Sequence, residues 1–63
     1  MSPIEQVVYN RLKEINQELG AVTGVLLAQL NGWSERSTRY WLRRMEELGL
    51  VARQGVRSGW RAV

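Results

Sequence analysis

Three helix-capping residues, each followed further along by a glycine, divide most of the chain into helical segments. The segment Ser2–Glu5 carries a capping serine, a proline at the first helical position and the glutamate of a capping box. Thr23 and Ser34 can cap the second and third segments. Glycine is a natural stop after a helix, and the stops here are Gly20, Gly32 and Gly49. These signals predict helices over residues 3–19, 24–31 and 34–48.

Apolar spacing predicts one small core shared by the three helices. In the first helix, apolar residues recur every three or four positions, as on one helical face. Its other face is polar, at Gln6, Asn10, Lys13, Glu14 and Gln17. With its apolar residues used inside the fold, this helix offers no seam to a second copy, so we expect a monomer in free solution. We expect the core to contain Ile4, Val8, Leu12, Ile15, Leu26, Leu27, Leu30, Trp41, Leu42, Met45, Leu48 and Val51.

The composition of the chain changes after Gly49. Residues 50–54 and 60–63 have the composition of short strands, and a glycine-flanked loop over 55–59 joins them. Two such strands around a short loop predict a β-hairpin, and we expect Trp60 to pack it onto the helices. Ala21-Val22 predicts a further, bridge-like strand. The sequence therefore predicts a single domain over residues 1–63, mainly α with a small β-hairpin.

Positive charge is concentrated in the second half of the chain, although the net charge is only +3. Residues 1–33 carry two basic against three acidic residues, whereas residues 34–63 carry seven against three. All seven of those basic residues are arginine, whose planar fork suits phosphates and base edges better than the point charge of lysine. This clustering favours an acidic partner.

The composition argues against catalysis and against membrane insertion. The chain has no cysteine and no histidine, so it lacks thiolate metal ligands and the commonest general base. Because its carboxylates are scattered, we expect no metal, no cofactor and no enzymatic activity. No apolar run approaches the roughly 20 residues that span a bilayer, and no signal-peptide pattern opens the chain. We therefore expect a soluble, cytoplasmic domain.

The predicted third helix has two chemically different faces. At about 100° per residue, Arg39, Tyr40 and Arg43 fall within about 60° of Arg36. Ser37 and Arg44 lie at one flank of this basic face, and Glu35 lies at the other. The opposite face carries Thr38, Trp41, Leu42, Met45 and Leu48. One face is thus expected to pack on the other helices, with Trp33 filling the gap between the second and third helices.

A resemblance to a known family is carried by the segment LLAQLNGWSERSTRYWLRRMEELGLVARQGVRSGWRAV. It resembles the winged helix-turn-helix domain of MarR-type and GntR-type transcriptional regulators. The match begins with the small Ala28, followed by Gly32 at the tight turn and the capping Ser34. The family's inward positions are occupied by Thr38, Leu42 and Met45. Asn31 and Trp33 depart from the family's usual apolar and smaller residues, which implies a slightly altered turn.

The resemblance implies a recognition helix over residues 34–48 in the major groove of double-stranded DNA. The hairpin would be an arginine-bearing wing on the backbone or the minor groove. Bidentate pairing with guanine is the commonest specific contact of arginine, so Arg36 is expected to read a base, whereas Arg57 at the wing tip suits the backbone. The expected DNA contacts are Ser34, Glu35, Arg36, Ser37, Arg39, Tyr40, Arg43, Arg44, Arg53, Arg57 and Arg61. The implied role is transcriptional regulation in the cytoplasm or nucleoid.

Two alternatives stay open at this point. Winged helices also serve as protein-interaction or assembly modules, in which case the basic face would meet an acidic protein or another subunit. RNA is the other alternative. An affinity that falls steeply with salt would separate nucleic acid from a mostly apolar protein interface.

Overall fold

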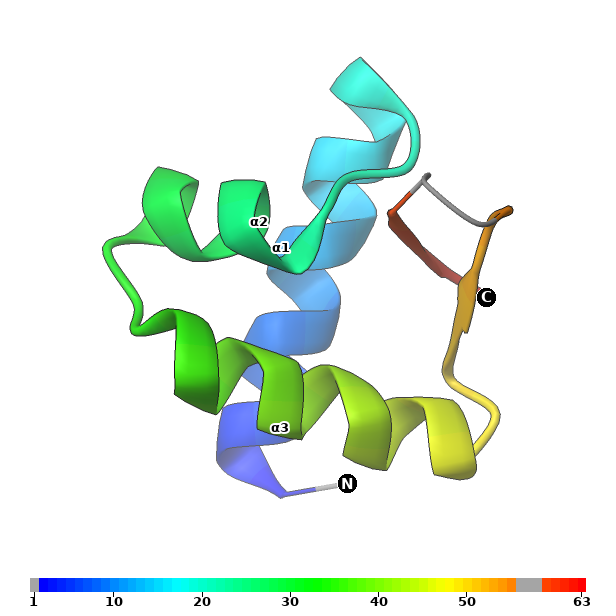
Figure 1. Ribbon diagram of the computed structural model, residues 1–63. Helices are drawn as coiled ribbons and strands as arrows, with labels where there is room; N and C mark the ends of the chain where they lie inside the picture. Colours follow the sequence, from blue (N-terminus) through cyan, green and yellow to red (C-terminus); the bar gives the residue numbers. More distant parts are fainter. Residues whose placement is uncertain (1, 56–58) are drawn as a thin grey trace.

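The structure, a computed structural model, describes residues 2–55 and 59–63. Over these residues the chain forms three helices followed by a two-stranded antiparallel hairpin (Figure 1). The elements are α1 (Pro3–Leu19), α2 (Gly24–Asn31), α3 (Glu35–Glu47), β1 (Val51–Arg53) and β2 (Trp60–Ala62). The predicted fold class, mainly α with a small β-hairpin, is confirmed. The bounds of α1 and α2 are those predicted, and α3 is one residue shorter at each end.

Local capping explains where the helices begin. The Ser2 hydroxyl accepts from Glu5 N at 3.2 Å, while Glu5 Oε1 accepts from Ser2 N at 3.1 Å, which completes the predicted capping box. Thr23 caps α2 through Leu26 N, and Ser34 caps α3 through Ser37 N, both at 3.1 Å. Each cap satisfies an amide that has no partner within its helix, so these boundaries are fixed by neighbours in sequence.

The core lies where α1 crosses behind α2 and α3, and the hairpin closes its remaining side (Figure 1). Leu12, Leu27, Leu42 and Met45 are fully buried there, so every helix contributes. Thr38 is fully buried as well, and its hydroxyl donates to Ser34 O at 2.8 Å, which satisfies the one polar group it brings inside. Trp60, the first residue of β2, is only 8 % exposed and packs the hairpin onto the helices as predicted.

Part of the predicted core is wrong. Val8, Leu12, Leu27, Leu42, Met45 and Val51 are buried, and Ile15 and Trp41 are half-buried against them. The four predicted core residues that are instead exposed are Ile4 (54 %), Leu26 (37 %), Leu30 (53 %) and Leu48 (57 %). Ile4 lies in the first turn of α1, and Leu48 is the residue that caps the C-terminus of α3. In α2, Leu27 and Ala28 take the inward direction and leave Leu26 and Leu30 on the outer side.

The hairpin is fastened to the helices by backbone and side-chain hydrogen bonds. Its strands pair in the register Val51↔Ala62, Ala52↔Arg61 and Arg53↔Trp60. Val22 forms the predicted bridge, because Val22 N donates to Trp60 O at 3.2 Å and Trp60 N donates to Val22 O at 2.6 Å. From α1, Asn16 Nδ2 donates to Gly20 O at 2.8 Å and to Trp60 O at 3.1 Å. Asn16 Oδ1 accepts from Ala62 N at 2.8 Å, so one side chain orients β2 against α1.

Candidate nucleic-acid interface

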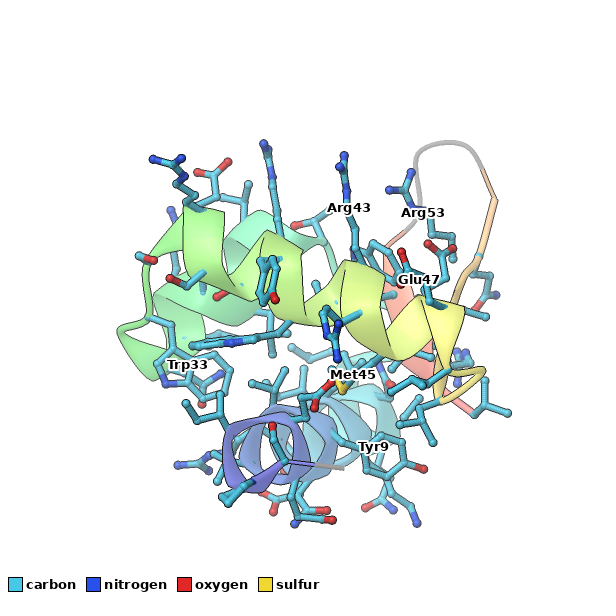
Figure 2. The ribbon with its side chains drawn as sticks, turned by 90° about the horizontal axis from the view of Figure 1, so that it is seen from below. Tyr9, Trp33, Arg43, Met45, Glu47 and Arg53 are labelled. Atoms are coloured by element: carbon cyan, nitrogen blue, oxygen red, sulfur yellow. The ribbon has the colours of Figure 1, made fainter. Side chains whose placement is uncertain are left out.

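The outward face of α3 carries a cluster of arginines around a tyrosine. A shallow hollow on this face is lined by Glu35, Arg36, Arg39, Tyr40 and Arg43. The Tyr40 side chain is 60 % exposed, whereas Leu42 and Met45 on the other face are fully buried. Figure 2 shows Arg43 and Arg53 projecting to the same side of the molecule, away from α1 and Tyr9. The structure therefore has the two-faced third helix that the residue pattern predicts.

A cleft of about 430 Å³ adjoins this face, where α2 begins, α3 passes and the hairpin returns. Among the described residues, three arginines line it and no acidic side chain does. They come from two elements, since Arg39 and Arg43 belong to α3 and Arg53 to β1. The remaining lining residues are Thr23, Gly24, Val25, Gly59 and Trp60. We call this site the arginine cleft.

The arginine cleft also contains uncharged hydrogen-bond donors. The Arg53 guanidinium stacks 4.8 Å from the centroid of the Trp60 ring, which holds the cation at the cleft wall. Trp60 Nε1 lies next to Gly24, and no described residue accepts a hydrogen bond from it. The amides of Gly24 and Val25 precede the first intrahelical bond of α2, which Leu27 N donates to Thr23 O at 3.0 Å.

These groups suit an anion of phosphate size. Backbone N–H groups at the start of a helix carry a partial positive charge and favour anions. Here that helix end faces a site lined by Arg39, Arg43 and Arg53 and by the indole of Trp60. Such a cleft attracts a phosphate through charge and orients it through directional donors.

Several predicted contact residues already have partners within the chain. Glu35 Oε1 lies 2.7 Å from Arg39 Nη2, one helical turn away. Ser34 Oγ accepts from Ser37 N, so this pair is engaged in capping α3. Arg44 stands apart from the arginine cleft, because its Nε is directed toward Glu5 Oε2 at 3.9 Å.

Arg53 and Arg61 lie on opposite faces of the hairpin. Successive residues of a strand point to opposite faces, so Arg61 lies on the face opposite Trp60. Arg61 Nε donates to Gln54 Oε1 at 2.7 Å, and the same guanidinium lies beside Gly20. Of the predicted hairpin contacts that the structure describes, Arg53 lines the arginine cleft and Arg61 does not. Arg57 lies outside the described residues.

Glu5 is a nearly buried carboxylate in the first turn of α1. Hydrogen bonding by Ser2, through its backbone N–H first and then its hydroxyl, lowers the pKa of Glu5 below the ordinary value of 4.5. The Arg44 guanidinium lowers this pKa further, against the opposing effect of burial. The pair ties the N-terminus of α1 to α3, so its role is in the fold and not in the arginine cleft.

A second surface, which we call the apolar groove, lies between α1 and the turn that precedes α3. Its volume is about 300 Å³, and its lining residues are Pro3, Ile4, Val7, Val8, Trp33 and Trp41. The rings of Trp33 and Trp41 pack edge to face, with centroids 5.9 Å apart. Trp33 is half-buried, packed against the core beside α3. The expectation that α1 uses all its apolar residues internally is wrong, because Ile4 and Val7 remain exposed.

Residue patterns located the arginines but missed the other half of the arginine cleft. Thr23 signals the start of a helix, so a donor-rich helix end at Gly24 could have been expected. Nothing in the sequence indicates that Trp60 reaches the same place, since that depends on how the hairpin folds back across Val22.

Comparisons with known proteins give no relatives: no protein-family model, curated protein or solved structure matches the chain. Within the described ranges, no helix has the length and apolar character needed to cross a membrane. Over the same residues, no three acidic side chains gather as a metal site would require.

Proposed function

We propose that the protein is a double-stranded DNA-binding module of the winged helix-turn-helix type, acting in transcriptional regulation. One observation carries the proposal: the arginine face of α3 and the arginine cleft open on the same side of the molecule (Figure 2). A helix that displays arginines beside an arginine-lined cleft is complementary to a duplex, which offers base edges in its groove and phosphates along the groove's rim. This role places the protein wherever cellular DNA is, in the cytoplasm or nucleoid.

The contacts divide into two groups by their position. The major groove, about 12 Å wide, admits an α-helix, and α3 presents Arg36 and Tyr40 from its outward face. Arg43 and Arg53 line the arginine cleft. There they bind a backbone phosphate, to which the Gly24 amide and the Trp60 indole N–H also donate hydrogen bonds. The cleft fixes the depth and register of α3, and the outward side chains read the sequence.

The direct test selects duplexes from a random DNA pool with the wild-type chain, then measures variants on the selected duplex and on a shuffled one. We expect Arg43→Ala and Arg53→Ala to weaken both duplexes alike, because phosphate contacts carry no sequence information. Arg36→Ala should lose about 1–3 kcal/mol on the selected duplex and relax the preference at one base pair. Arg11→Ala is the matched control, since Arg11 pairs with Glu14 on α1, outside both arginine surfaces. Failure to enrich any sequence, with affinities that ignore Arg43 and Arg53, would refute the proposal.

A second candidate function, a protein-interaction module, is favoured by the apolar groove. Its exposed Ile4 and Val7 and its paired tryptophans offer an apolar surface that the DNA proposal leaves unused. A protein partner held there would bind with an affinity nearly independent of salt and sensitive to Val7→Ser. DNA held at the arginines shows the reverse pattern, so one titration series separates the two functions.

A further inference from the structure

We propose that Glu35 sets the sequence specificity of the interface by holding Arg39 ready to read a base and away from the phosphate cleft. The inference rests on the proposed DNA binding. It gives a role to a carboxylate that stands on the edge of a strongly positive face.

Arg39 is the side chain shared by both surfaces. It lines the arginine cleft and also the hollow on α3, whereas Glu35 lines the hollow alone. The base of the Arg39 side chain lies beside α2, next to Gly24. Its tip is held by Glu35 Oε1, 2.7 Å from Arg39 Nη2, at the first turn of α3. The ion pair therefore draws the guanidinium toward the start of the recognition helix.

The orientation of the Arg39 guanidinium affects how well it can recognise a base. An arginine reads guanine best when its planar fork is held in one orientation, because it then donates to O6 and N7 together. A free Arg39 has a competing site in the arginine cleft, where a phosphate would attract it regardless of sequence. Both side chains of the pair are about half exposed, and exposed pairs of this kind add little to stability. The effect expected of Glu35 is thus on discrimination and not on folding.

Glu35→Asp is the decisive variant, because it keeps the charge and shortens the side chain by one methylene group, which breaks the 2.7 Å contact. The readout is the ratio of affinities for a duplex selected by the wild-type chain and a shuffled duplex. We expect Glu35→Asp to reduce this ratio by about 5- to 100-fold. We expect Glu35→Gln to reduce it too, and to steepen the salt dependence by about one phosphate contact on the shuffled duplex.

Glu47→Gln is the matched control for charge. Glu47 lies on the same helix and, by its position in the helical repeat, on the same side as Arg43, and no described residue forms an ion pair with it. Removing its charge should raise the affinity for both duplexes and leave their ratio unchanged. In an Arg39→Ala background, Glu35→Asp should have no further effect on the ratio, because its partner is gone.

The outcomes separate the two proposals. A wild-type chain that prefers no sequence overturns the proposed function, and this inference with it. A wild-type preference that survives Glu35→Asp overturns the inference alone. An effect of Glu35→Asp that persists in the Arg39→Ala background also overturns it, because Glu35 would then be reading a base by itself.

Discussion

Gly59→Ala is the substitution that most sharply tests how the hairpin is joined to the helices. Gly59 is buried where the chain crosses the segment between α1 and α2. A methyl group at this position would overlap the carbonyl carbon and oxygen of Val22 and crowd Thr23 N. These are backbone atoms, so no side-chain rotation relieves the overlap and the hairpin must move away.

The cost follows from what that movement breaks. The two backbone hydrogen bonds between Val22 and Trp60 are lost, at about 1 kcal/mol each. Trp60 also loses part of its burial, and a fully buried large apolar side chain contributes about 1.5–3 kcal/mol. We therefore expect Gly59→Ala to lower the free energy of unfolding by about 3–5 kcal/mol. At about 4–8 °C per kcal/mol for a domain of this size, the melting temperature should fall by at least about 12 °C.

Thermal unfolding followed by circular dichroism measures this fall, with urea unfolding as a second measurement. Gly49→Ala is the control, because an added Cβ at Gly49 would meet no atom within 4 Å, and the positive φ of 77° is the feature that opposes the change. Only the left-handed backbone opposes that change, at about 1–2 kcal/mol. The reasoning is refuted if Gly59→Ala destabilises the protein no more than Gly49→Ala does.

Three further predictions follow from the core, from Glu5 and from the apolar groove. Because Leu42 is fully buried, Leu42→Ala should lower the free energy of unfolding by about 2–5 kcal/mol. A variant that melts within a degree or two of the wild type would contradict the position of α3. Since the folded state lowers the pKa of Glu5, its stabilisation is present above about pH 4.5 and is lost as pH falls through the lower folded pKa. The stability of Glu5→Gln should accordingly depend less on pH than that of the wild type as pH falls below about 4.5. Sedimentation should find a monomer at micromolar concentration, because a stable interface needs about 800 Å² per partner and the apolar groove is small. A tight dimer that dissociates on Val7→Ser substitution would contradict this expectation.

The fold was predictable to the extent that its signals are local. Ser2, Thr23 and Ser34 each bond to an amide within three residues, so the start of every helix could be read from the sequence. Periodicity also identified the inward face of α3, including the buried polar Thr38. Periodicity gives the direction of a side chain but not whether another element covers it. For this reason Ile4 was placed inside, although 54 % of it remains exposed.

In the candidate site, too, the features set by local spacing were predictable and those set by long-range contacts were not. The arginines of α3 were assigned to one face by their spacing, and the structure places Arg36, Arg39 and Arg43 together. The arginine cleft depends on contacts between distant segments, such as the bridge from Val22 to Trp60 and the bonds of Asn16 to β2. Pairing of this kind leaves no periodic signal in sequence. Arg44 is an example: its spacing placed it at the flank of the basic face of α3, but spacing could not show that its nearest carboxylate belongs to Glu5 on α1.

The salt dependence of the affinity for duplex DNA is the direct test of whether the arginine cleft binds the DNA backbone. Each phosphate neutralised by an arginine contributes about −0.9 to the slope of log affinity against log salt concentration. With Arg43 and Arg53 on phosphates, we expect a slope of about −2 or steeper for the wild-type chain, and a slope shallower by about one unit for Arg53→Ala. Arg11→Ala should leave the slope unchanged, since Arg11 lies on α1. A slope near zero, or one that Arg53→Ala does not alter, would contradict binding of the DNA backbone at the arginine cleft.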